Sequence, residues 1–545
     1  MNRIFTILTL ALLVSSSLMG QERYLDQLFT DVEVRTELYG TNATVIALSV
    51  VGEAIEQPLP MDIYTPVGDT ATNRAVVLVF HTGNFLPNVT NGQIPGTRQD
   101  SSVVEICTRL AQRGYVAASC DYRVGWNPLA QSQPERALGL IQAAYRGVQD
   151  GRTAVRFMRS TVDTGNDYGI DPSRIAVLGQ GTGGYLVLGM AGLSDYNEIL
   201  TTTNGPAKFF LDTDGDGMPD TPMVVQEFHG DINGEVLTVT PADGFGLPMG
   251  DTTNIANHVG YSNDIGLAIN LGGALGDVSW LDDNTTPTIS IQHPFDIFAP
   301  YEDAVLIVPT TGDPIVQVQG AKVIGPAQMA NGANSVFVED GIIFDDPVTM
   351  MARANAAAAG CDYVEGVFPF LTPPNSAGIP EGVQVDWWDP NAPSPANGAG
   401  MGIPWNMLPH PAGGTFHEQG LILNENMSAE KARGNIDLCM DYIYPRACVA
   451  LDLPCRSFFV SNTEELLPSA LATVTPNPAS DFINIEADDV IQSIELLDMQ
   501  GRLVKKVTNL SVQTYRLDIL DSLTGMHTLN IRFEEGVVAK KIILN

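Results

Sequence analysis

The feature that most constrains the fold is a wholly apolar strand that runs directly into a glycine-rich turn and then into an apolar helix. Residues 175–178 read Ile-Ala-Val-Leu, residues 179–184 read Gly-Gln-Gly-Thr-Gly-Gly, and an apolar run follows at 185–188. A strand without polar alternation is expected where helices cover both faces of a sheet, which is typical of parallel sheets. The segment therefore predicts an α/β fold with a doubly wound, mostly parallel sheet.

The same alternation of strands and helices continues on both sides of this turn. Because strands that alternate with helical segments form parallel sheets, residues 22–460 are predicted to be one large α/β domain. The expected strands are 74–80, 115–120, 175–178, 267–271 and 288–292, and the expected helices include 103–114, 137–160 and 428–444.

The N-terminus has the pattern of a secretory signal peptide. Arg3 precedes an apolar run at 4–14, and small residues lead to Gly20, so cleavage is expected near residue 20. The run is too short to span a bilayer comfortably, and no other membrane span is expected. Six cysteines in an exported chain permit disulfides, but their pairing cannot be read from the sequence.

The C-terminal part differs from the rest. Residues 461–472 are predicted to be a linker, and residues 473–545 show short alternating strands separated by glycines, as in a small β-sandwich. The runs 476–479 (Pro-Asn-Pro-Ala), 498–502 (Asp-Met-Gln-Gly-Arg) and 540–543 (Lys-Lys-Ile-Ile) resemble the type A sorting domain of the Bacteroidetes type IX secretion system. This resemblance implies export across the outer membrane by that machinery, followed by release or surface attachment. The alternative is an unrelated β-sandwich that binds a ligand.

The chain is strongly acidic, with 63 Asp and Glu against 28 Lys and Arg and a formal net charge of -35. Such a surface argues against nucleic acid and anionic membranes as partners and favours cations. Because alternate carboxylates in a short glycine-containing loop can wrap around one Ca²⁺, the loop 212–220 is predicted to bind structural calcium. The expected ligands are Asp212, Asp214, Asp216 and Asp220. The alternative is an acidic turn exposed to solvent.

Several motifs around the central turn resemble the carboxylesterases of the α/β-hydrolase superfamily. They are 80–85 (Phe-His-Thr-Gly-Asn-Phe), 121–126 (Asp-Tyr-Arg-Val-Gly-Trp) and 149–157, and the resemblance covers about residues 70–200. It implies that 179–183 is a nucleophile elbow of the form Gly-x-Ser-x-Gly. It also implies that the loop at His81, Thr82 and Gly83 offers backbone N–H groups to an oxyanion.

The nucleophile position of this elbow holds Gly181, which has no nucleophilic atom. One hypothesis is that covalent catalysis has been lost and the fold binds a ligand. A second is that Thr182 serves as the nucleophile. A third is that 179–184 is a phosphate cradle of the form Gly-x-Gly-x-x-Gly, although no acid stands at a convincing ribose position.

In this fold the acid and the histidine of a catalytic triad follow the nucleophile along the chain. Asp296 comes shortly after the strand 288–292 and is the predicted acid, with Asp313 as its rival. His417 precedes the last helix and is the predicted histidine, with His410 second. Residues of about 345–408 are predicted to be a lid-like insertion, whose tryptophans at 387–388 could stack on a sugar or aryl ring.

Two functions are compatible with these residues. The first is a secreted carboxylic ester hydrolase that acts on a small-molecule or polymer ester through Thr182, or through a water activated by His417 and Asp296. The second is a catalytically inactive surface protein that binds a carbohydrate or a lipid-like ligand.

Overall fold

The chain divides into two compact units, Met1–Phe459 and Val460–Asn545. Each unit is described by itself. The computed structural model describes residues 21–46, 51–202, 208–213, 215–241, 248–282, 286–296, 298–308, 311–339, 341–378, 381, 385–395, 402–460, 471–498, 503–508, 510–519, 524–533 and 536–544. The predicted signal peptide and most of the predicted linker lie outside these residues.

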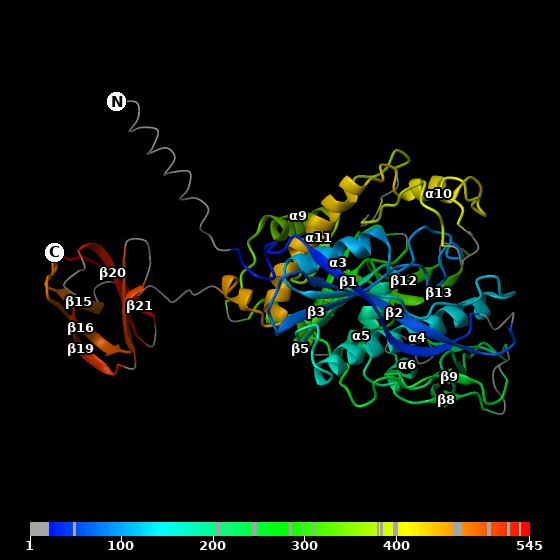
Figure 1. Ribbon diagram of the computed structural model, residues 1–545, viewed down its shortest axis with the longest axis horizontal. Coiled ribbons are helices and arrows are strands. Elements are labelled where there is room, and N and C mark those ends of the chain that lie inside the picture. Colours follow the sequence, from blue (N-terminus) through cyan, green and yellow to red (C-terminus); the bar gives the residue numbers. More distant parts are fainter. Residues whose placement is uncertain are drawn as a thin grey trace. The chain divides into compact units, whose positions relative to one another are not determined.

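The first unit is a layered α/β structure (Figure 1). Its strands are β1 (Val32–Thr44), β2 (Ile55–Pro66), β3 (Arg74–Phe80), β4 (Val116–Cys120), β5 (Ile170–Gln180), β6 (Phe210–Leu211), β7 (Thr221–Pro222), β8 (Thr238–Val239), β9 (Thr252–Asn254), β10 (Leu267–Leu271), β11 (Thr288–Gln292), β12 (Asp303–Ile307), β13 (Pro314–Gln319) and β14 (Val367–Pro369). Its helices are α3 (Ser101–Gln112), α4 (Gln133–Asp163), α5 (Thr182–Gly192), α6 (Asn197–Leu200), α7 (Gln226–His229), α8 (Ala321–Ala330), α9 (Pro347–Ala358), α10 (Phe416–Leu423) and α11 (Ala429–Ala450), with short 3₁₀ helices η1 (Val278–Leu281), η2 (Ala333–Phe337) and η3 (Pro454–Phe458).

The central sheet of this unit has eight strands among the described residues, in the order β1-β2-β4-β3-β5-β10-β11-β14. β1, β2 and β4 pair antiparallel in succession, whereas every pairing from β4 through β3 to β14 is parallel. Helices lie on both faces, with α3 and α11 on one and α4 and α5 on the other (Figure 1). The predicted doubly wound, mostly parallel α/β fold is therefore confirmed.

The apolar composition of the inner strands explains their place in the sheet. Every residue of β3, β4, β10 and β11 is buried, including the polar side chains that some of them carry. Burying one large aliphatic side chain stabilises a fold by about 1.5–3 kcal/mol, so a strand exposed on either face would lose several such contributions. The strands predicted at 267–271 and 288–292 match β10 and β11 residue for residue.

The two longest helices begin at side chains that cap them. Ser132 accepts a hydrogen bond from the backbone N–H of Glu135, whose carboxylate accepts from the Ser132 N–H, so α4 starts with a capping box. Ser428 caps α11 in the same way through the N–H of Lys431. Both helices extend beyond their predicted ends, and the residues added to α11, 445–449, are buried in the core.

The predicted lid-like insertion at 345–408 is wrong in its first half. That segment contains α9 and β14, and β14 is the outermost parallel strand of the central sheet. The strand was missed because it is only three residues long and ends in Pro369, which breaks the alternation on which strand prediction depends. Only the later part of the segment lies outside the layered core.

One disulfide joins Cys448 and Cys455 at the end of α11. Cys107 and Cys120 are buried and stay as free thiols. No helix in the described ranges combines the length and the apolar content that crossing a bilayer requires.

The second unit contains two antiparallel sheets with the strand orders β15-β16-β19 and β18-β17-β20-β21. One apolar core, which includes Ile483, Ile485, Leu529 and Ile531, takes side chains from both sheets. The strands are β15 (Ala472–Thr475), β16 (Phe482–Ile491), β17 (Ser493–Leu497), β18 (Leu503–Val507), β19 (Val512–Asp518), β20 (Gly525–Arg532) and β21 (Val537–Leu544). This is the arrangement of a small β-sandwich.

Two of the motifs that the sequence singled out meet in this sandwich. The side chain of Asn477 donates a hydrogen bond to the carbonyl of Lys541 (2.9 Å) and accepts one from the N–H of Ile543 (2.9 Å). The run 476–479 therefore fastens the start of the module to its last strand.

Candidate functional site

The glycine-rich turn forms a sharp bend between β5 and α5. A single residue, Gly181, separates the end of the strand from the start of the helix, and its backbone has φ 54° and ψ −114°. This region is strained for a residue with a side chain. The Gly181 N–H donates to the carbonyl of Leu271 (2.8 Å), which holds the bend against β10. The geometry is that of a nucleophile elbow.

The two flanking glycines are required by close packing. A Cβ at Gly179 would overlap the carbonyl group of Gly183, and a Cβ at Gly183 would lie 2.8 Å from the carbonyl carbon of Phe80. Any larger residue at either position would push α5 away from the sheet. The elbow pattern in the sequence therefore reflects a packing requirement that the structure satisfies.

The predicted oxyanion loop lies directly beside the bend. The His81 ring is buried, its Nδ1 donates to the carbonyl of Thr82 (2.5 Å), and its Nε2 lies 3.5 Å from a carboxylate oxygen of Asp121. The ring also stacks on Tyr122 with 4.5 Å between centroids. Burial lowers the pKa of His81. These contacts make His81 a residue that holds the loop in shape.

Thr82 and Gly83 occupy different places in this loop. The side chain of Thr82 lies over Gly181, close to the position that an elbow side chain would take. Gly83 has φ 125°, and a Cβ there would lie 3.0 Å from the Cα of Gly96, so only glycine fits.

Thr182 is the first residue of α5, and its hydroxyl lies 3.4 Å from the hydroxyl of Tyr122. The Tyr122 hydroxyl donates to the carbonyl of His81 (2.9 Å), and burial raises its pKa. A phenol with a raised pKa stays protonated at neutral pH and cannot take a proton from Thr182. No histidine or carboxylate among the described residues forms a hydrogen bond with Thr182.

The predicted acid, Asp296, follows β11 as expected for this fold. One carboxylate oxygen accepts from the N–H groups of Phe298 (2.7 Å) and Ala299 (3.3 Å), and burial raises the pKa of Asp296 to about 6. Its rival, Asp313, is bound by the guanidinium of Arg136 through two bonds of 2.6 and 2.8 Å. The hydrogen bonds from Arg136 lower the pKa of Asp313 to about 2, so Asp313 is held in an ion pair.

The predicted histidine, His417, has an indole as its partner in place of a carboxylate. Its Nδ1 accepts from Nε1 of Trp388 (3.1 Å), and both residues line an open surface depression with Trp387 and Glu425. His410 bonds to the carbonyl of Gly92 through Nε2 (3.1 Å).

All seven histidines of the chain lie in the described ranges. Only His81 approaches a described carboxylate, and that carboxylate, Asp121, is also bound by Arg98. The structure therefore pairs neither His417 nor His410 with Asp296.

Two half-buried carboxyl groups beside the elbow were missed by the sequence analysis. Asp386 accepts from Nε2 of Gln180 (2.6 Å) and from the hydroxyl of Ser102, while Asp100 accepts from backbone N–H groups at 96–97. Burial raises the pKa of both groups, and their mutual repulsion raises that of Asp100 further. No local signal announces this pair, because Asp386 is brought to Gln180 only by the fold.

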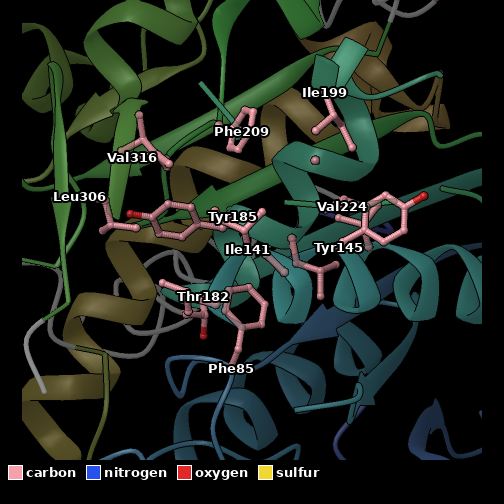
Figure 2. A pocket seen from close by; sticks show the side chains of 18 of the residues that line it. Phe85, Ile141, Tyr145, Thr182, Tyr185, Ile199, Phe209, Val224, Leu306 and Val316 are labelled. Carbon is pink, nitrogen blue, oxygen red and sulfur yellow. The ribbon is translucent and has the colours of Figure 1, made fainter. Parts of the chain in front are cut away.

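An apolar cavity of about 130 Å³ opens next to the elbow. Figure 2 shows Thr182 and Phe85 at one end of it and Ile199 and Phe209 at the other. Trp280 stacks on Phe209 with 5.5 Å between ring centroids and closes part of the wall. Aliphatic side chains from α4, α5 and the β12–β13 hairpin complete the lining.

The predicted calcium loop has a compact turn structure. The Asp212 carboxylate accepts from the N–H groups of Gly215 (2.7 Å) and Gly217 (2.8 Å), and Asp216 accepts from the N–H of Met218 (2.8 Å). Asp214 lies outside the described residues. Within the described residues no three His, Cys, Asp or Glu side chains are grouped to hold a metal, so calcium binding by Asp212, Asp216 and Asp220 stays a prediction.

The comparisons with known proteins find two family models along the chain. The BD-FAE model matches residues 61–216, and the model described as "Secretion system C-terminal sorting domain" matches residues 473–545. No curated protein matches the chain.

Solved structures of esterase 2 from Thermogutta terrifontis are similar to part of this chain. The sarin-phosphonylated form has 22% identity and a TM-score of 0.20, over 30% of this chain and 46% of that one. The paraoxon-phosphorylated form has 17% identity and a TM-score of 0.27, over 49% and 73%. The first of these matches spans a little under half of the solved esterase.

The sorting domain places the protein among those that are secreted or attached to the cell surface. The elbow, the oxyanion loop and strands β3, β4 and β5 lie within the BD-FAE match, whereas β10, β11 and β14 follow it along the chain. The chain therefore contains a BD-FAE region at residues 61–216, within its α/β unit, and ends in a secretion-system C-terminal sorting domain at residues 473–545.

Proposed function

We propose that this secreted esterase-like protein binds an ester or a related neutral ligand beside its elbow without forming an acyl-enzyme. The observation that carries the proposal is Gly181, which places bare backbone at the point where a serine hydrolase presents its nucleophile. The neighbouring hydroxyl of Thr182 has a tyrosine as its hydrogen-bond partner and no base among the described residues.

The ligand class follows from the cavity and the charge of the chain. An apolar cavity of about 150 Å³ accommodates a molecule the size of benzene, so the cavity here suits a short acyl chain or one aromatic ring. Thr182 and Asn84 are polar residues in the lining and can orient an ester group. A net charge of -35 disfavours an anionic ligand.

Three measurements on the purified protein test the proposal. We expect no turnover of p-nitrophenyl butyrate above buffer, no labelling by a fluorophosphonate, and measurable calorimetric binding of butyranilide, the amide analogue of phenyl butyrate. Ala144→Phe, which fills the cavity, should abolish the binding, whereas Ala357→Phe on the exposed face of α9 should not. Fluorophosphonate labelling that disappears in Thr182→Ala would overturn the proposal.

Hydrolysis by an activated water is the second candidate function. It is favoured by Asp296, whose pKa of about 6 makes it a better base than an ordinary aspartate. In this case turnover would occur without fluorophosphonate labelling, would rise with pH around 6, and would be lost in Asp296→Asn.

A further inference from the structure

The space above Gly181 is occupied by the side chain of Thr82. A Cβ added at Gly181 would lie 3.0 Å from the Thr82 Cβ and closer still to the Thr82 Oγ1. Both distances fall below ordinary van der Waals contact, which begins near 3.4 Å. Thr82 therefore takes the volume from which an elbow side chain would project.

Turning the Thr82 side chain moves its Oγ1 away from position 181 but leaves the 3.0 Å contact with the Thr82 Cβ. The short distance between the two Cβ atoms is the same in every rotamer, because a Cβ position is fixed by the backbone. The backbone of Thr82 is itself held, since its carbonyl accepts from the buried His81 ring and that ring stacks on Tyr122. A side chain at 181 is thus crowded by the side chain at 82 and can be added only if one of the two shifts by a few tenths of an ångström.

The Thr82 hydroxyl is available to a ligand. The residue is half-buried, and within the described part of the chain its Oγ1 has no hydrogen-bond partner. Because the residue is not fully buried, water or a ligand can reach this hydroxyl and bond to it. Thr82 and Gly181 do not line the apolar cavity themselves, but they lie close in the chain to Asn84 and Thr182, which do.

We propose that Thr82 replaces the elbow residue as the polar ligand contact: its hydroxyl donates a hydrogen bond to the carbonyl oxygen of the bound ester or amide. This inference rests on the proposed function, and it names the specificity-determining residue of that site. Thr82 acts by binding and not as a nucleophile, because both nitrogens of the nearest imidazole, His81, face other groups.

A cycle of four proteins, namely the wild type, Gly181→Ser, Thr82→Gly and the double variant, tests the steric half of the proposal. Gly181→Ser should lower the apparent melting temperature of the wild type by several degrees, and should lower that of Thr82→Gly by clearly less. The strain of a positive φ at 181 is present in both, so the difference isolates the overlap. Equal losses in the two backgrounds would overturn the crowding of position 181 by Thr82.

Two conservative variants test the ligand contact. Thr82→Val keeps the bulk but removes the hydroxyl, and should weaken butyranilide binding about five-fold, as expected for one hydrogen bond. Thr82→Ser keeps the hydroxyl and should bind like the wild type. Unchanged affinity in Thr82→Val would overturn the contact. Failure of the wild type to bind butyranilide would overturn the proposed function and the contact together, whereas the melting temperatures decide the steric crowding independently.

Discussion

Replacing Asp150 by Asn tests whether a buried charge pair holds together the motifs that surround the elbow. Asp150 is 0% exposed and Arg123 is 1% exposed. The carboxylate accepts from Nε of Arg123 (2.9 Å) and from its backbone N–H (2.7 Å). Asparagine has the same shape without the charge, so the buried guanidinium would keep only neutral acceptors, chiefly Gln149 (3.0 Å) and the carbonyl of Ala43 (3.1 Å).

The expected loss of stability follows from the burial of this pair. Removing one partner of a buried ion pair costs about 3–5 kcal/mol, because the remaining charge is left without compensation. Since Arg123 keeps two neutral acceptors, we expect the lower end, about 3 kcal/mol. In urea unfolding followed by tryptophan fluorescence the midpoint should fall by roughly 1 M. Asp163→Asn at the exposed end of the same helix is the control and should change stability by less than about 0.5 kcal/mol.

A second variant separates the charge from the packing. Arg123→Met combined with Asp150→Leu removes both charges, and replacing a buried pair by apolar residues is often neutral. The double variant should therefore be more stable than Asp150→Asn. If Asp150→Asn costs less than about 1 kcal/mol, or if the double variant is the weaker of the two, the reasoning is refuted.

Three further predictions follow from the same structure. Replacing Cys448 and Cys455 by Ser should lower the free energy of unfolding by about 2.5 kcal/mol, which is the loop-closure entropy that a disulfide across so short a loop removes. If a reductant leaves the urea midpoint of the wild type unchanged, this prediction is wrong. Burial raises the pKa of Asp296 from 3.8 to about 6, so the folded state binds this proton more tightly and stability should fall as pH rises from about 4 to 6. Asp296→Asn should remove this loss, so its free energy of unfolding should exceed that of the wild type by up to about 3 kcal/mol as the pH rises from about 4 to 6. A difference between the two proteins in urea unfolding that does not change with pH would refute this. If the loop 212–220 binds calcium, 1–5 mM Ca²⁺ should raise the melting temperature of the wild type but not that of Asp216→Ala with Asp220→Ala, a readout that an acidic turn without a site would not give.

The sheet could be predicted from the sequence because its inner strands are buried on both faces. The strands at 267–271 and 288–292 are apolar enough to be recognised locally, and the bend at 179–183 carries its own glycine pattern. β14 has only three residues, which is too short for any periodicity. The length of the apolar stretch in the sequence therefore determined which strands of the sheet could be predicted.

The site was harder to predict because its contacts join distant segments. The sequence placed Thr82 in the oxyanion loop, but nothing local indicates that its side chain lies over Gly181. In the same way, Asp386 and Gln180 are far apart in the sequence, and only the fold brings them into contact. His417 forms its hydrogen bond with Trp388, whereas a triad would require a carboxylate in that place. Chain order gives the expected order of catalytic groups, but it does not bring their side chains together.

The sharp bend does not by itself imply catalysis, because packing alone requires it. The crowding at Gly179 and Gly183 lets α5 start directly against β3 and β5, and this contact would be needed whatever residue stood at 181. A serine at position 181 would be strained by the positive φ, whereas glycine adopts this backbone conformation without strain. The elbow is therefore a structural joint in this chain. We expect the ligand to be recognised by Thr82 in the oxyanion loop and by the apolar cavity beside the elbow. Substitutions at Thr82 and in the cavity lining are therefore the ones that test function.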